Sequence, residues 1–478
     1  MDEPHLRFGV ISDIHAQLAE DGLSLVPDAN TGTIERALAF FRDNGADAVV
    51  VAGDFTDSGL VRELRAFADI WRKVFPGNRA PDGRKVERIF ATGNHDAYGL
   101  ANGRRVFQDE EVLRREVIQG DPQKAWRECF GEDYEPFFTK TVRGYDFFCA
   151  QWAPGVWCNG YAETGCSGCE AAFRRKMARC DPARPFFYVQ HPHPAGTVYG
   201  VNAWGVDDGE ATRLLSGFPQ AVAFSGHSHE PLTNEKSIWR GAFTSVATGS
   251  LRYVSGSFAW NFEHRPGYEN GICNYYGPGI GIEGRGPIRA KFDAPKTMPD
   301  QTYDFAVQTG LFVSVFDDRV EIARRDFASG LELGAPWIVP VPARPASFEE
   351  RAASSAPPQF PAGAALAASV ARAATRGLKW HEWNIEPEQK QSLRLDFPAA
   401  TECGHVVEYE IAAVGGGERF ATRICAIGGL YPPGSDRHRQ PEHAVVALDR
   451  LPADAREISV APLDSFGNRG VPLRAKLP

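Results

Sequence analysis

The stretch AVAFSGHSHEP, residues 221–231, joins a short apolar run to two histidines that are one residue apart. The apolar run predicts a buried strand that ends near Gly226. Along a strand, His227 and His229 would point to the same side, because side chains alternate with a period of two. Such a pair fits three interpretations: a solvated turn, a two-histidine zinc clip, or part of a larger metal site that other stretches complete.

Four more stretches place metal-ligating residue types directly after apolar runs. They are SDIH with Asp13 and His15, AGDFTD with Asp54, TGNHD with Asn94 and His95, and QHPHP with His191. Each alone has a simple structural explanation, since an aspartate after a strand commonly caps a turn. Together they predict one site, because the carboxyl ends of strands in an open α/β sheet meet along one edge, where ligands bind.

Strand-like and helix-like segments alternate through the first half of the chain. Residues 33–45 and 60–75 carry apolar residues at helical spacing, and RFGVIS, ADAVVVAGD and VERIFATG predict buried strands. This alternation is typical of the α/β class, with a sheet covered on both faces. Strand-like hairpins after residue 244 predict a second sheet. The Gly- and aromatic-rich segment 256–286 is either a lid over the site or a surface insertion.

A change of composition divides the chain, whose 478 residues exceed one average domain. Residues 341–377 are rich in Pro, Ala and Ser, which predicts a linker between one domain at 1–340 and another at 378–478. Short strand-like segments after this linker predict an all-β sandwich. Its closing ISVAPLDSFGNRG resembles the final strand and turn of fibronectin type III modules.

The charge balance, the first residues and the cysteines limit the partners and the cellular compartment that we expect for the protein. With 52 basic and 61 acidic residues the net charge is -9, so no overall positive field recruits nucleic acid. The first residues lack a secretory signal and no apolar run is long enough for a membrane span, which predicts a cytoplasmic protein, or an exported one if a leader was removed. Nine cysteines, an odd number, favour free thiols, while Cys166 and Cys169 leave a small disulfide or a structural metal open.

The residue types at the five strand ends indicate which class of metal ion the site would bind. Carboxylates with imidazoles suit Mn, Fe, Zn or Co better than Ca, and none of the motif residues is a thiolate. Seven candidate ligands are too many for one tetrahedral ion, but two ions that share a carboxylate would use them all. Two ions about 3.5–4 Å apart form the arrangement used for phosphoryl transfer.

In this order, the motifs D-x-H, G-D, G-N-H-D, H and G-H-x-H resemble the signature of the calcineurin-like metallophosphoesterase superfamily over roughly residues 6–340. The resemblance implies a four-layer α/β/β/α sandwich of two mixed sheets flanked by helices, and two divalent metal ions. It assigns Asp13, His15 and His229 to the first ion and Asn94, His191 and His227 to the second, with Asp54 as the bridge. It also implies that His95 is a general acid or phosphate contact whose ring Asp96 orients. His193 competes with His191 as the ligand.

Departures from particular branches narrow the implied activity. Purple acid phosphatases carry a tyrosine where Asp57 stands, and the GNHE of Ser/Thr protein phosphatases is absent. GDFTD, GNHD and GHSH look more like the bacterial phosphodiesterase branch, and HPHPAGTVYG resembles a group of bacterial metallophosphoesterases that are often exported. The resemblance implies a metal-dependent hydrolase of small phosphate esters, a phosphodiesterase that uses a metal-activated hydroxide. A phosphomonoesterase is the alternative.

Two other classes share the fold. A scaffold protein would be expected to have lost ligands, yet all seven are present, and a nuclease would need a basic surface that the acidic balance disfavours. The C-terminal domain is a candidate for contact with a partner or a carbohydrate. Candidates for lining a substrate pocket are Tyr199, Asn202, Trp204, Arg252 and Tyr253.

Overall fold

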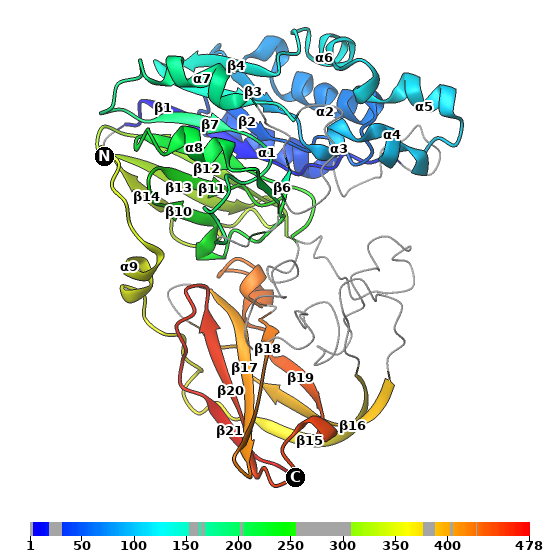
Figure 1. The fold of residues 1–478 in the computed structure, drawn as a ribbon, viewed down its shortest axis with the longest axis vertical. Helices are drawn as coiled ribbons and strands as arrows, with labels where there is room; N and C mark the ends of the chain where they lie inside the picture. The colour runs from blue at the N-terminus through cyan, green and yellow to red at the C-terminus, as the bar shows by residue number, and fades with distance from the viewer. Residues whose placement is uncertain are drawn as a thin grey trace. The chain divides into compact units, whose positions relative to one another are not determined.

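The computed structural model describes residues 3–18, 31–152, 162–163, 168–200, 203, 205–254, 307–375, 388–401, 405–426 and 428–478 (Figure 1). The chain divides into two compact units. The first comprises Met1–Leu232, Ser237–Tyr253 and Ala306–Ser347, and the second comprises Thr233–Lys236, Val254–Phe305 and Phe348–Pro478. Segment 256–286, expected as a lid or an insertion, lies outside the described residues.

The first sheet of the first unit has the order β14-β13-β12-β1-β2-β3. Its strands β1 (Leu6–Ile11), β2 (Ala48–Ala52) and β3 (Glu87–Ala91) are parallel. Strands β12 (Thr309–Val315), β13 (Arg319–Asp326) and β14 (Trp337–Pro340) extend the sheet in antiparallel fashion. All five residues of β2 are buried, which explains its continuous apolar sequence AVVVA.

The second sheet has the order β10-β11-β9-β7-β5-β4. Strands β5 (Tyr145–Ala150), β7 (Phe186–Val189), β9 (Ala221–Ser225) and β11 (Thr244–Ala247) are parallel. Strands β4 (Phe137–Val142) and β10 (Ile238–Arg240) pair antiparallel at the two edges. A separate two-stranded ladder joins β6 (Ala162–Glu163) to β8 (Val206–Asp207).

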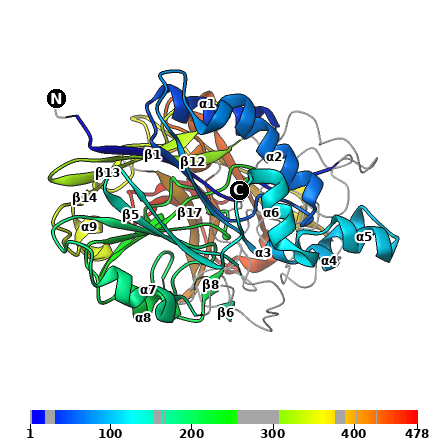
Figure 2. The ribbon, with the colours of Figure 1, turned by 90° about the horizontal axis from the view of Figure 1, so that it is seen from above.

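Helices cover the outer face of each sheet (Figure 2). On the first sheet lie α1 (Thr31–Asp43), α2 (Val61–Val74) and α6 (Pro122–Phe130), and on the second lie α7 (Cys169–Met177) and α8 (Glu210–Leu215). The short helices α3 (Asn94–Ala97), α4 (Gly99–Asn102) and α5 (Glu110–Glu116) follow β3. The two mixed sheets with flanking helices confirm the predicted fold class.

The inner faces of the two sheets meet in one apolar core. Alternation along β1 sends Phe8 into this core, where its ring makes edge-to-face contacts with Phe147, Phe187 and Phe224 of the second sheet. The same alternation turns Ile11 to the opposite face, against α1 and α2. The sheets are thus held at a spacing that brings their strand ends to a common edge.

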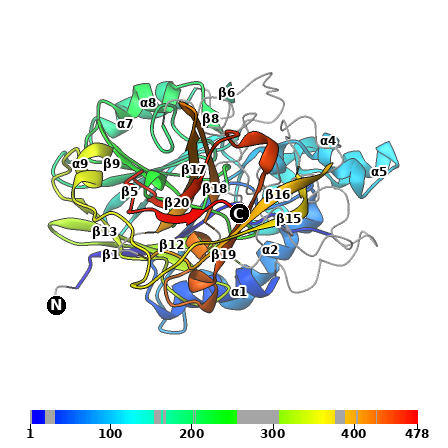
Figure 3. The ribbon, with the colours of Figure 1, turned by 90° about the horizontal axis from the view of Figure 1, so that it is seen from below.

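In its described residues, the second unit contains two antiparallel sheets and helix α9 (Phe348–Ala353). One sheet has the order β15-β16-β19, and the other has the order β18-β17-β20-β21. Figure 3 labels β15, β16 and β19 of the first sheet and β17, β18 and β20 of the second. A single apolar cluster joins Leu393 and Val446 of the first sheet to Ile411 and Val460 of the second. The expected all-β C-terminal region is confirmed. The strands are β15 (Ala367–Thr375), β16 (Glu388–Phe397), β17 (Val406–Gly415), β18 (Glu418–Cys425), β19 (Glu442–Ala447), β20 (Glu457–Asp464) and β21 (Leu473–Lys476).

The segment expected to be a linker, residues 341–377, differs from that expectation. It contains helix α9, and its residues 367–375 form β15, which pairs along its whole length with β16. Backbone hydrogen bonds to β16 stabilise this edge strand. The Ala-rich side chains of the strand give no sign of this pairing in the sequence. Composition therefore indicated a linker where the backbone forms a sheet.

None of the helices in the described ranges is long and apolar enough to cross a membrane.

Replacement of Phe8 tests the packing between the sheets. Phe8→Ala should lower the free energy of unfolding of the first unit by about 3–5 kcal/mol, because it leaves a cavity among three aromatic rings. Phe8→Leu, which fills more of the space, should lose clearly less. Urea unfolding followed by near-ultraviolet circular dichroism measures both, and equal losses for the two variants would contradict this role.

Candidate metal centre

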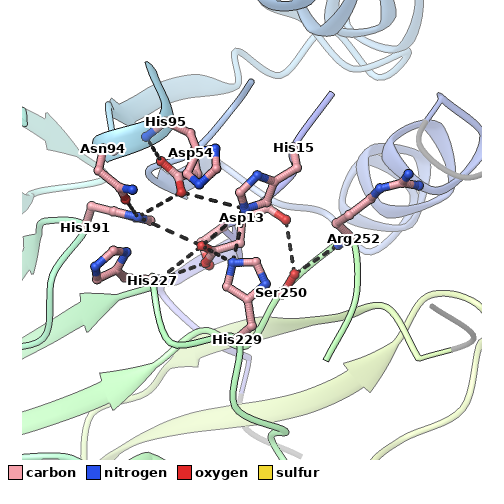
Figure 4. A network of polar contacts seen from close by, with 12 residues as sticks. Asp13, His15, Asp54, Asn94, His95, His191, His227, His229, Ser250 and Arg252 are labelled. Atoms are coloured by element: carbon pink, nitrogen blue, oxygen red, sulfur yellow. Dashed lines mark hydrogen bonds and ion pairs between the residues drawn. The ribbon is translucent and has the colours of Figure 1, made fainter. Parts of the chain in front are cut away.

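The predicted site residues lie at one edge of the two sheets, after the carboxyl ends of their parallel strands (Figure 4). Strands β1 and β2 are followed by the aspartates and by His15, and β3 leads into α3, which carries Asn94 and His95. In the second sheet, β7 and β9 supply the remaining histidines. The structure brings together all seven expected ligands: Asp13, His15, Asp54, Asn94, His191, His227 and His229.

The backbone at these strand ends turns sharply. Eight described non-glycine residues have a positive φ, and five of them are expected ligands. A left-handed conformation costs roughly 1–2 kcal/mol for such a residue, so surrounding contacts must hold it. Strain of this kind clusters at functional sites. The five residues are Asp13 (49°), His15 (44°), Asp54 (55°), His227 (78°) and His229 (55°).

Glycines beside the ligands leave room for their side chains. A Cβ atom at Gly53 would overlap the His191 ring, and one at Gly93 would overlap the Asp54 carboxylate. A Cβ at Gly226 would lie 2.5 Å from an Asp13 carboxylate oxygen. The glycines of the G-D, G-N-H-D and G-H-x-H motifs are therefore required by close packing against ligands that come from other strands.

The first ligand group consists of Asp13, His15 and His229, whose ligand atoms lie within 4.8 Å of one another. Asp13 Oδ1 is 2.9 Å from His229 Nε2, and His229 Nε2 is 3.1 Å from His15 Nε2. The other carboxylate oxygen of Asp13 accepts a 2.5 Å hydrogen bond from the hydroxyl of Ser12. These are the three residues expected at the first ion.

The second group consists of Asp54, His191 and His227, again within 4.8 Å. His191 Nε2 lies 3.2 Å from Asp54 Oδ2 and 3.1 Å from Asn94 Oδ1, so the expected fourth ligand Asn94 faces the same nitrogen. The backbone N–H of His95 donates to Asp54 Oδ1 at 2.9 Å, which leaves Oδ2 for the group.

Two contacts between side chains join the groups. Asp54 Oδ2 lies 3.7 Å from His15 Nε2 of the first group, and Asp13 Oδ1 lies 3.9 Å from His191 Nε2 of the second. The two carboxylates thus stand between two sets of imidazoles. A carboxylate in that position can bridge a pair of ions, which is the role expected of Asp54.

Polar contacts on the outer ring nitrogens orient His191 and His15. His191 Nδ1 lies 2.7 Å from the carbonyl oxygen of Ala52, and a carbonyl only accepts, so the Nδ1 atom carries the proton. His15 Nδ1 lies 3.3 Å from Asp57 Oδ1, which favours the same tautomer. In the neutral ring Nε2 then presents its lone pair to the group, as metal-ligating histidines do.

The buried carboxylates of the site also need compensating positive charge. Burial alone would raise the pKa of Asp13, but His229, His15 and His191 hold that pKa well below its usual range. Burial likewise opposes protonation of His15 and His191, yet nearby carboxylates raise their pKa values to about 9 and about 10. Protons therefore supply the positive charge in the metal-free chain. Buried carboxylates with imidazole nitrogens fit divalent metal ions.

The structure does not pair His95 with Asp96, the residue expected to orient its ring. His95 Nδ1 lies 2.7 Å from the carbonyl oxygen of Asp57, and its ring lies edge-on to His15 with centroids 4.5 Å apart. The Asp96 carboxylate instead accepts hydrogen bonds from the backbone N–H groups of Phe55, Thr56 and Gly93 and from the Thr56 hydroxyl. Asp96 therefore shapes the loop after β2, and Asp57 orients His95.

Asp57 is the main residue that the sequence prediction missed as part of the site. With His15 and His95 it forms a third group of close ligand atoms. Since His15 Nδ1 faces Asp57 while His15 Nε2 faces Asp13, we interpret this contact as support for the ligand histidine. The signal was present in the sequence, because Asp57 ends the GDFTD motif.

Hydroxyl groups around Asp13 were also missed. Ser12 Oγ lies 2.6 Å from Thr248 Oγ1, and the Ser250 hydroxyl donates to the Asp13 carbonyl oxygen at 3.1 Å. Thr248 and Ser250 follow β11, which is parallel to β9 and ends at the same edge. The polar run after the strand TSVA was the available signal.

The alternative ligand His193 points elsewhere. Its Nδ1 lies 2.8 Å from Ser225 Oγ and its Nε2 lies 2.9 Å from Ser228 Oγ. Burial lowers the pKa of His193 to about 3, so its ring is neutral. His191, not His193, faces the ligand groups.

The substrate-lining candidates separate into three cases. Tyr253 packs against His229, with ring centroids 4.3 Å apart, and Arg252 Nη2 lies 3.5 Å from the Gln17 side chain. Tyr199 is buried, and its hydroxyl lies 2.9 Å from Ser237 Oγ, so it serves packing. Asn202 and Trp204 lie outside the described residues.

The cysteines stay apart from the ligand groups of the described chain. Cys129, Cys149, Cys169 and Cys180 are free thiols, and burial raises the pKa of each. Cys169 begins α7 and its side chain is buried in the core, whereas Cys166 is outside the described residues.

Part of this chain is similar to known proteins. Residues 6–231 match the family model of calcineurin-like phosphoesterases. A transmembrane protein with metallophosphoesterase domain from Danio rerio is 29% identical over 129 residues, which are 27% of this chain and 25% of that protein. The chain thus matches about a quarter of the length of this curated relative.

Two solved structures resemble the fold. A dimetal phosphatase from Danio rerio matches 71% of this chain and 100% of its own, with 10% identity and a TM-score of 0.40. A purple acid phosphatase from yellow lupin seeds matches 70% of this chain and 53% of its own, with 13% identity and a TM-score of 0.39.

Metal binding should become tighter as the pH rises from 6 to 8. His15 and His191 are protonated over this range in the metal-free chain, since their pKa values are about 9 and about 10. Each must release a proton before it can bind an ion, so the apparent affinity should rise about tenfold per pH unit for each proton released. The gain should level off above pH 10.

Titration calorimetry of EDTA-treated protein with Mn²⁺ measures this dependence. Runs in two buffers of different ionisation enthalpy count the protons released. An affinity that is constant between pH 6 and 8, with no proton release, would contradict the assigned protonation states.

Proposed function

Residues 6–231 belong to the calcineurin-like phosphoesterase family, and we therefore propose that this chain is a phosphodiesterase that depends on two divalent metal ions. Its family makes it a hydrolase of phosphate esters. The observation that carries the proposal is the pair of adjoining buried ligand groups, Asp13–His15–His229 and Asp54–His191–His227. A single ion would leave half of these buried donors without a cation.

The first group would hold one ion, and the second group, with Asn94, would hold the other. Asp54 would contact both, since it faces His191 and His15. When bound, the two ions would supply Lewis-acid polarisation of the phosphoryl group and would lower the pKa of a coordinated water. The protein holds the imidazoles in the required tautomer and excludes solvent from the carboxylates.

His95 would transfer a proton to the leaving alkoxide. Its Nδ1 is engaged by the Asp57 carbonyl, so Nε2 is the nitrogen that can donate when the ring is charged. Burial lowers the pKa of His95, and nearby carboxylates only partly oppose this. The negative charge of a bound phosphate ester would raise that pKa again and favour the donating form.

The preference for diesters is supported by the motif forms. Asp57 occupies the position of the tyrosine ligand in purple acid phosphatases, and it engages His15 and His95. The sequences GDFTD, GNHD and GHSH are similar to those of the phosphodiesterase branch. Two ions and a single proton donor suffice for a diester, which carries one negative charge and a poor leaving group.

Paired substrates test this proposal. The protein loaded with Mn²⁺, Co²⁺, Zn²⁺ or Fe²⁺ should hydrolyse bis(p-nitrophenyl) phosphate or a cyclic nucleotide faster, in kcat/KM, than p-nitrophenyl phosphate. Turnover of the monoester alone would replace this proposal with a phosphomonoesterase. Full metal loading without hydrolysis of either class would favour a binding protein.

Replacement of His95 tests the proton transfer. His95→Ala should lower kcat for an alkyl diester by about 10²–10⁴-fold while two ions remain bound, because His95 belongs only to the third group, with Asp57, and to neither of the two groups proposed to hold the ions. The loss should shrink for a p-nitrophenyl diester, whose leaving group needs no proton. His5→Ala, which removes an exposed histidine paired with Asp317, is the matched control. Loss of metal in His95→Ala would show that His95 is a ligand.

A further inference from the structure

We propose that His193 is a positioning residue for the metal centre, which fixes the turn that carries His227 and His229. It would do so through Ser225 and Ser228, and we call these three residues the His193 clamp. The inference rests on the proposed dimetal centre and adds residues outside the seven expected ligands.

The clamp joins the start of the turn to its middle. His193 Nδ1 lies 2.8 Å from the hydroxyl of Ser225, which ends β9. His193 Nε2 lies 2.9 Å from the hydroxyl of Ser228, which stands between the two ligand histidines. The His193 side chain is fully buried. One rigid ring therefore sets the distance between the start of the turn and its middle.

The turn needs such a restraint. His227 and His229 have φ values of 78° and 55°, a conformation that each residue adopts at a cost of about 1–2 kcal/mol. The Asp13 carboxylate accepts the His227 N–H at 3.0 Å. The next residue, Ser228, is held through its side chain, whose hydroxyl lies 2.9 Å from His193 Nε2. Without the clamp, relaxation of either residue would swing a ligand ring away from its group.

His193 is itself well anchored. Its backbone N–H donates to the Gly205 carbonyl at 2.8 Å, and its own carbonyl accepts from the Asp207 N–H at 2.8 Å. The Tyr199 ring packs edge-on against the His193 ring, with centroids 5.4 Å apart. These contacts tie His193 to Tyr199, Gly205 and Asp207, which lie outside the turn that carries His227 and His229.

The same segment contacts His227 directly. Gly205 has a φ of 77°, and a Cβ there would lie 2.8 Å from His227 Cδ2. The His227 ring is thus packed against the Gly205 backbone while Ser228 is bonded to His193. Gly205 and His193 therefore restrain the second ligand group from outside, one at the His227 ring and the other at the neighbouring Ser228 side chain.

The hydrogen bonds explain why this histidine is not a ligand. Both of its ring nitrogens are engaged by serine hydroxyls, and a hydroxyl can either donate or accept. A neutral imidazole, which donates from one nitrogen and accepts at the other, satisfies both serines at once. Partners outside the ligands typically change metal affinity by 10–100-fold when they are removed.

Cobalt binding to the full-length metal-free protein tests the clamp. We expect the wild-type protein to bind two Co²⁺ ions. In His193→Leu, the more weakly bound of the two ions should bind about 10–100-fold less tightly, and the visible absorption band of bound Co²⁺ should change. His193→Gln, whose amide can also donate and accept, should restore most of the affinity. The readouts are a competitive indicator titration and the absorption spectrum of bound Co²⁺, and neither depends on activity.

A matched control separates positioning from general stability. Tyr188 lies in β7, the strand before the clamp, and its hydroxyl donates a buried 2.7 Å hydrogen bond to Gln190. Tyr188→Phe removes this hydrogen bond. It should lower the melting temperature of the metal-free protein while leaving cobalt affinity and spectrum unchanged. His193→Leu with wild-type affinity and spectrum would overturn the inference, even if its melting temperature falls.

Further variants keep the test decisive. If His193→Leu does not fold, Ser228→Ala replaces it, and wild-type cobalt affinity in that variant would equally overturn the clamp. Wild type that binds fewer than two Co²⁺ would contradict the proposed dimetal centre, and the clamp with it. Two bound Co²⁺ in wild type with no effect of the variants would contradict the clamp alone.

Discussion

Two buried carboxylates, Asp13 and Asp54, are the constraint on which the site depends. A carboxylate removed from water costs several kcal/mol unless positive charge and hydrogen bonds compensate it. Strands from both sheets deliver that compensation, since imidazoles from β1, β7 and β9 surround the two carboxylates. The hydroxyl of Ser12 and the backbone N–H groups of His227 and His95 complete it. The four-layer fold matters because it brings these strand ends to one edge.

The same constraint explains the local backbone. To bring side chains from five loops so close together, the chain turns sharply after each strand, and ligand residues adopt left-handed conformations. Gly53, Gly93 and Gly226 remain without side chains because a ligand from another strand occupies the space of a Cβ. The conformational cost is offset by the rigid sheets, whose shared aromatic core around Phe8 holds the two halves of the site together.

The two ligand groups have similar inner donors but different outer support. The first is supported by Asp57 behind His15 and by hydroxyls around Asp13. The second is supported by the Ala52 carbonyl behind His191 and by the His193 clamp behind the turn at His227. Because outer partners set the basicity and orientation of ligand histidines, the two positions need not bind ions with equal affinity.

The sequence by itself determined the α/β class of the N-terminal part, the all-β C-terminal region and the set of residues that gather at the sheet edge. It could do so because apolar periodicity and the residue types at strand ends are local properties. Only the tertiary structure decided that Asp57, not Asp96, orients His95, that His193 faces two serines, and that residues 367–375 form a strand. Those outcomes depend on which backbone and hydroxyl groups meet across the fold, and residues far apart in the chain supply them.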